Sequence, residues 1–192
     1  MQMALSQKSY GVYPMLRELN CGHENLEVPR VLQQKGHGRF VVDVGVAYDA
    51  QETKAAVQNG FHVIGFEPNP KNIAQLRITF QSDPQITIVD LVPTGDPIKP
   101  WKLPDSVSRP SVDRKSGYGV AYIIAAGLDE TNGVSRISGT KVDYATKIGS
   151  VSSVSSTGLQ EGDVPVVKLD DILPDWATHI AMMKIDTQGI FL

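Results

Sequence analysis

A strand–helix–strand pattern over residues 41–70 constrains the fold more than any other part of the sequence. Its first segment is rich in β-branched apolar residues, which is typical of a strand buried on both faces of a sheet. Small apolar residues at helical spacing follow over 50–59, Gly60 is a typical helix stop, and residues 61–66 form a second apolar run. A strand, a crossover helix and a strand within about 30 residues predict a βαβ unit.

Two residues at the ends of these strands indicate a ligand site. Gly45 lets the chain turn after the first strand with no side chain in the way of a ligand. Glu67 follows the second strand about 20 residues later, a position from which a carboxylate can accept hydrogen bonds from ribose hydroxyls. Because a βαβ unit brings both strand ends to one edge of the sheet, we expect Gly45 and Glu67 to lie together.

The residues of the first turn favour one class of nucleoside ligand over another. The turn lacks the G-x-G-x-x-G pattern, and a pyrophosphate needs bare backbone amides close to a helix N-terminus. Tyr48 and Asp49 would crowd and repel such a ligand. S-adenosylmethionine carries a ribose and a cationic sulfonium but no phosphate, so it fits this turn better than a dinucleotide does.

Four segments resemble the motifs of the FkbM-type S-adenosylmethionine-dependent methyltransferases. VVDVGVAYDAQET and GFEPNP are similar to the first two motifs of that family, and VVKLDDIL and MMKIDTQG are similar to its Leu-Asp-Asp segment and its Lys-Ile-Asp-x-x-Gly strand end. The resemblance covers about residues 40–189, apart from an unmatched middle. It implies an α/β fold with a Rossmann-like class I methyltransferase sheet, and S-adenosyl-L-methionine as the cofactor.

The resemblance also implies roles for individual residues. Asp43 and Gly45 would lie by the methionine moiety of the cofactor, in a cofactor-binding turn that includes Ala47. Glu67 would hold the ribose, and Asp129 would contact the adenine. The residue types of segment 129–133 are also typical of a turn that needs no ligand, so a purely structural role for Asp129 stays open.

Asp186 is the candidate catalytic residue. It follows the apolar run 180–185, and in open α/β sheets ligands bind outside the carboxyl ends of the strands. Asp186 could accept a proton from an acceptor hydroxyl or orient the substrate. It could equally cap the turn that follows it.

The remaining segments extend the α/β pattern. Asn69 and Pro70 predict the cap and first position of a helix that continues to about residue 81. Trp101 lies in a proline-rich stretch, which we expect either to border the substrate pocket, with Trp101 as a recognition surface, or to be a poorly ordered insertion. The other expected segments are short helices within 1–38, strands at 86–92, 120–126, 134–137, 164–169 and 180–185, a long loop over 93–117, and a polar surface loop over 148–162.

Composition excludes several classes of partner. A net charge of −3 gives no electrostatic footprint for nucleic acid or for an anionic membrane surface. Cys21 is the single cysteine, so an intrachain disulfide is impossible, and no histidine or cysteine lies at metal-ligand spacing. No apolar run reaches the length of a signal peptide core or a membrane span, so a cytoplasmic location is expected.

Class I methyltransferase sheets have more strands than this sequence supplies after residue 185. We therefore expect an N-terminal helical segment over 1–38 and a partial Rossmann-like methyltransferase domain over 39–192, either truncated or completed by a partner. The strand at 180–185 would then present an apolar edge, which invites self-association.

Two functions from different classes follow from these features. The first is methyl transfer from S-adenosylmethionine to an oxygen or nitrogen nucleophile of a small molecule or sugar, in which catalysis is mainly alignment. The alternative is a truncated, non-catalytic remnant that binds the cofactor, or an interaction module. A nucleotide-dependent oxidoreductase is disfavoured by the first turn.

Overall fold

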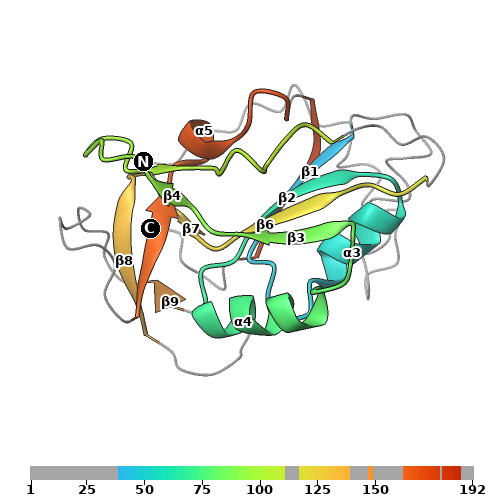
Figure 1. Cartoon of the computed structure of the whole chain (residues 1–192), viewed down its shortest axis with the longest axis horizontal. Helices are drawn as coiled ribbons and strands as arrows, with labels where there is room; N and C mark the ends of the chain where they lie inside the picture. The colour runs from blue at the N-terminus through green and yellow to red at the C-terminus, as the bar shows by residue number, and fades with distance from the viewer. Residues whose placement is uncertain (1–38, 111–116, 139–146, 149–161, 178, 187–192) are drawn as a thin grey trace, which may run out of the picture.

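The computed structural model describes residues 39–110, 117–138, 147–148, 162–177 and 179–186, and a parallel sheet lies at its centre (Figure 1). All neighbouring strands of this five-stranded sheet are parallel, in the order β11-β1-β2-β6-β3. The strands are β1 (Phe40–Val44), β2 (His62–Phe66), β3 (Ile86–Val89), β6 (Ala121–Ile124) and β11 (Ile180–Ile185). The architecture confirms the predicted α/β, Rossmann-like class of fold.

Two helices, α3 (Gln51–Gln58) and α4 (Pro70–Thr79), cover one face of this sheet (Figure 1). Asn69 caps α4 as predicted, since its side-chain oxygen accepts a hydrogen bond from the Lys71 N–H at 2.9 Å. The two helices pack on every second side chain of the strands because side chains alternate between the faces of a sheet. This core contains Val41, Val63, Ala121 and Ile123 from the strands and Ala56, Val57, Ile73, Leu76 and Phe80 from the helical side.

A small second sheet and a short helix pack on the opposite face. The sheet has the order β7-β10-β8-β9, built from β7 (Gly127–Leu128), β10 (Asp163–Val167), β8 (Gly133–Ser138) and β9 (Lys147–Ile148). The helix α5 (Leu169–Ile172) follows β10. Their buried residues contact the side chains of the main sheet that point away from α3 and α4. This second core contains Val42, Val44, Ile64, Phe66 and Ile124 from the main sheet and Val134, Val167 and Ile172 from the second sheet and α5.

Trp101 belongs to this second core, so its prediction as a recognition surface is wrong. Its side chain is 6% exposed, and its indole N–H donates to the Gly133 carbonyl at 2.7 Å. It lies in β5 (Trp101–Lys102), which pairs antiparallel with β4 (Val92–Pro93). The indole has a large apolar area and one N–H group, so it is stable in the interior once that N–H has a hydrogen-bond acceptor.

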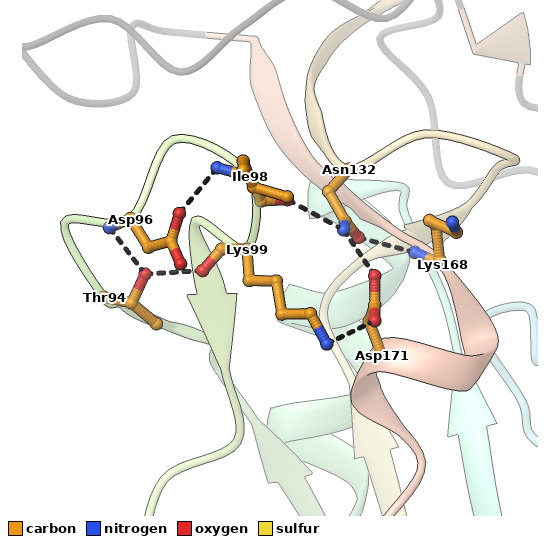
Figure 2. Close-up of polar contacts among 7 residues, drawn as sticks. All are labelled: Thr94, Asp96, Ile98, Lys99, Asn132, Lys168 and Asp171. Atoms are coloured by element: carbon orange, nitrogen blue, oxygen red, sulfur yellow. Dashed lines mark hydrogen bonds and ion pairs between the residues drawn. The ribbon is translucent and has the colours of Figure 1, made fainter.

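Asn132 contacts the turn between β4 and β5 from outside, while Thr94 and Asp96 form hydrogen bonds within it (Figure 2). The Asn132 amide donates to the Ile98 carbonyl at 3.1 Å and to Asp171 Oδ2 at 2.8 Å, and its oxygen accepts from the Lys168 N–H at 2.8 Å. Lys99 Nζ forms an ion pair with Asp171 Oδ1 at 2.7 Å, and this contact lowers the pKa of Asp171. Asn132 therefore links the turn to both β10 and α5.

The segments predicted as strands are strands in the structure, and their ends differ from the predicted ends by a few residues. The strand predicted over 86–92 ends at Val89, and β6 lies between β2 and β3. Among the described residues β11 pairs with β1, and its exposed side chains include Ile180, Met183 and Ile185. Self-association through this edge stays a prediction.

Two predicted segments lie outside the described residues: the N-terminal helical segment 1–38 and, apart from residues 148 and 162, the polar loop. Within the part of the chain that the structure describes, no helix is both long enough and apolar enough to span a bilayer.

We predict that Asn132→Asp lowers the free energy of unfolding by roughly 1–3 kcal/mol, because the new carboxylate cannot donate to the Ile98 carbonyl or to Asp171. Urea unfolding at neutral pH measures this loss. The matched control is Gln81→Glu, the same amide-to-acid change on an exposed side chain, with an expected effect within about 0.5 kcal/mol. Equal losses in the two variants would show that Asn132 does not hold the turn.

Candidate functional site

The carboxyl ends of β11, β1 and β2 meet at one edge of the main sheet. The Gly45 and Val46 N–H groups both donate to the Phe66 carbonyl, at 2.9 and 3.2 Å. On the other side of β1, the Asp186 N–H donates to the Val44 carbonyl at 2.9 Å. The turn after β1 is therefore held between the ends of its two neighbouring strands, as the βαβ pattern predicted for Gly45 and the end of the second strand.

Glu67 closes this turn from the end of β2. Its carboxylate accepts a hydrogen bond from the Ala47 N–H through Oε2 and another from the Asn69 N–H through Oε1, both at 2.8 Å. The residue is 3% exposed, and burial raises the pKa of the Glu67 carboxyl, while the hydrogen bonds from Asn69 and Ala47 act in the opposite direction. The structure thus brings Gly45, Ala47 and Glu67 together.

Three residues in and around the turn have left-handed backbone conformations. Gly45 has φ 82°, Ala47 has φ 60° and Ala50, which precedes α3, has φ 49°. This region costs a residue with a side chain about 1–2 kcal/mol, so the two alanines store strain beside the candidate site. Such strain is found preferentially at ligand sites and switch regions.

Gly45 is required by a contact within the protein itself. A Cβ atom at this position would collide with the backbone carbonyl oxygen of Asp186. From the sequence, we expected the glycine to leave room for a ligand. The structure adds that it leaves room for the end of β11.

Asp43 is buried below the turn, with an exposed fraction of 1%. Its Oδ2 accepts a hydrogen bond from the Thr53 hydroxyl of α3 at 2.7 Å. Its Oδ1 lies 3.2 Å from Lys184 Nζ in an ion pair and has no hydrogen bond of regular geometry. Burial raises the pKa of Asp43, and the neighbouring Lys184 opposes that rise. Both carboxylate oxygens therefore face protein groups, and a contact of Asp43 with the cofactor stays a prediction.

Lys184 is the site residue that the sequence reasoning did not single out. It lies on β11 opposite Asp43, its side chain is 9% exposed, and its Nζ donates to the Gly45 carbonyl at 2.9 Å. The signal was present in the segment MMKIDTQG, where a lysine interrupts an apolar strand. A charge inside a buried strand is costly unless it is paired, and this implies a nearby carboxylate.

The remaining two predicted residues are both exposed but are placed differently. Asp129 follows β7 of the second sheet, and its side chain accepts hydrogen bonds from the Glu130 and Thr131 N–H groups at 2.6 and 3.4 Å. This geometry favours the interpretation of Asp129 as a turn residue. Asp186 lies at the end of β11 beside Gly45, so the structure brings it to the same edge as Glu67.

We predict that Gly45→Ala lowers the free energy of unfolding by more than the 1–2 kcal/mol that left-handed backbone alone costs alanine. The matched control is Gly95→Ala, because Gly95 has nearly the same φ, 81°, and a Cβ there would meet no other atom within 4 Å. Urea unfolding of both variants isolates the collision with the Asp186 carbonyl as the excess loss. Equal losses would contradict the close contact between the turn and β11.

The comparisons with known proteins agree with this geometry. The family model of the methyltransferase FkbM domain matches residues 31–190. No curated protein and no solved structure matches the chain. The matched range contains all three strand ends of the site and most of the chain. The protein therefore belongs to the FkbM methyltransferase family.

Proposed function

We propose that this protein transfers a methyl group from S-adenosylmethionine to an oxygen or nitrogen nucleophile of a small molecule or sugar. Membership of the FkbM family indicates methyl transfer in general. The identity of the donor and the class of the acceptor are our proposal. The observation that carries it is the Glu67 carboxylate, held by the Ala47 N–H at the edge where β1 and β2 end.

The hydrogen bonding of Glu67 supports a ribose as its ligand. An ionised carboxylate has roughly four acceptor sites. The Ala47 and Asn69 N–H groups and the side chain of Asn72 occupy three of them. A ribose hydroxyl is a neutral donor that can use the remaining acceptor site, whereas a phosphate offers no donor when it is ionised.

The charges around the turn support a cationic ligand. Asp43, Glu52 and Glu67 lie around the turn and the first residues of α3, and Lys184 is the cation that the structure places among them. Acidic groups therefore predominate among the described residues of this region. Such an arrangement favours a sulfonium and disfavours a pyrophosphate.

The chain's own residues would then act by alignment. When bound, S-adenosylmethionine supplies an activated methyl group and a neutral leaving group, so no nucleophilic side chain is required. The turn 45–47 and Glu67 would orient the donor, and Asp186, exposed beside Gly45, would accept the proton of an acceptor hydroxyl or orient the acceptor.

The alternative is a non-catalytic cofactor-binding remnant or interaction module. The left-handed backbone of Ala47 and Ala50 is the observation that favours it, since neither position has the glycine that such a backbone prefers. Absence of S-adenosylmethionine binding by the folded protein would support the interaction module.

We predict that Glu67→Gln weakens S-adenosylmethionine binding about tenfold or more, because the ribose loses a charged acceptor and the new amide N–H₂ group faces a backbone N–H donor. Calorimetric titration with S-adenosylmethionine, and in parallel with NADH, measures the effect. The matched control is Glu130→Gln, an exposed glutamate that carries the same charge change. Unchanged affinity in Glu67→Gln, or tighter binding of NADH than of S-adenosylmethionine, would contradict the proposal.

A further inference from the structure

We propose that Lys184 is a positioning residue that fixes the cofactor turn from the neighbouring strand and pairs with the buried Asp43 beneath it. This inference rests on the proposed function, because it assigns the turn to the methyl donor. It gives a role to Lys184, which lies in the segment MMKIDTQG but had no role assigned to it from the sequence.

The sheet register places Lys184 at the turn. Asp43 of β1 and Lys184 of β11 are directly paired in the parallel ladder, so their side chains project from the same face of the sheet. That face is covered by α3, which contributes Thr53 and Glu52 from its first turn. Lys184 therefore lies where β1, β11 and the start of α3 converge.

The ammonium of Lys184 forms one hydrogen bond, to the backbone of the turn, and two ion pairs. An ammonium carries three N–H groups. Its Nζ lies 2.9 Å from the Gly45 carbonyl oxygen, 3.2 Å from Asp43 Oδ1 and 3.8 Å from Glu52 Oε2. The contact with the carbonyl is the informative one, because it reaches the backbone of the turn and not only another side chain.

The contacts make the shape of the turn depend on β11. The N–H of Gly45 is bound to β2 and its carbonyl is bound to Lys184, while its α-carbon lies against the Asp186 carbonyl. A glycine with its conformational freedom would otherwise be the most mobile point of the turn. Lys184 thus couples the turn assigned to the methyl donor to β11, the strand that leads to Asp186. Asp186 is the residue proposed to contact the methyl acceptor.

The charge of Lys184 has a second consequence, which a merely structural contact would lack. The charged groups that face Asp43 in the described residues are Lys184 from β11, Glu52 from α3 and Glu67 at the end of β2. Lys184 alone among them lowers the pKa of Asp43. Its removal raises that pKa, so Asp43 takes up a proton at a higher pH than in the wild-type protein.

The first experiment needs no cofactor. Amide hydrogen exchange of Gly45 and Val46, which donate to the Phe66 carbonyl, is compared in the wild-type protein, Lys184→Met and Lys184→Arg. We expect exchange at these amides to become roughly tenfold faster or more in Lys184→Met, the effect of losing a hydrogen bond to a charged group, and to return toward the wild-type rate in Lys184→Arg. The matched control is Lys102→Met, an exposed lysine whose loss should leave the turn unchanged.

The second experiment measures S-adenosylmethionine binding as a function of pH. We expect Lys184→Met to bind more weakly at neutral pH and to lose binding at a higher pH than the wild-type protein as the solution is acidified. Lys184→Arg should keep the wild-type midpoint. If Lys184→Met does not fold because Asp43 is left unpaired, the double variant D43N/K184M removes both charges, and its turn amides should still exchange faster.

The outcomes separate this inference from the proposed function. Failure of the wild-type protein to bind S-adenosylmethionine overturns the proposed function, whereas the exchange of the turn amides still tests the contact with Lys184. Unchanged exchange in Lys184→Met, or in the double variant, overturns the positioning role. An unchanged pH midpoint in Lys184→Met overturns the electrostatic part of the proposal.

Discussion

The Glu67 carboxylate is the group on which the candidate site depends. A buried carboxylate is costly unless hydrogen bonds compensate for the lost water. Here the compensation comes from the backbone of the turn after β1 and from the start of α4, through the N–H groups of Ala47 and Asn69. The same hydrogen bonds that make the buried acid tolerable also fix the turn, so the fold and the candidate site share one set of contacts.

The two faces of the sheet have different roles in supporting this edge. On one face α3 places Thr53 and Glu52 beside Asp43 and Lys184, so the charged groups under the turn are confined between helix and sheet. On the other face the second sheet, α5 and the indole of Trp101 form an apolar core. The charged cluster is therefore bordered by packed side chains, which limit its access to water and strengthen its interactions.

Local patterns in the sequence predicted the elements that depend on neighbouring residues alone. The periodicity of residues 41–70 gave β1, α3 and β2, and Asn69 with Pro70 gave the start of α4. Partners that are distant in the sequence were not predictable in this way. Trp101 packs in the second core, where Gly133 accepts its N–H, and Lys184 lies beside Asp43 because β11 pairs with β1 in one register. The periodicity of apolar residues indicates which side chains are buried, but it does not indicate which residues they contact.

The most direct test of the central claim is a crystal structure of the protein with S-adenosylmethionine or its demethylated product. Our account predicts a ribose hydroxyl within hydrogen-bonding distance of the Glu67 carboxylate, and the methionine moiety beside the turn formed by Gly45 and Ala47. A ligand bound at any other edge of the sheet, with Glu67 still closed on the turn and out of contact with it, would contradict the account.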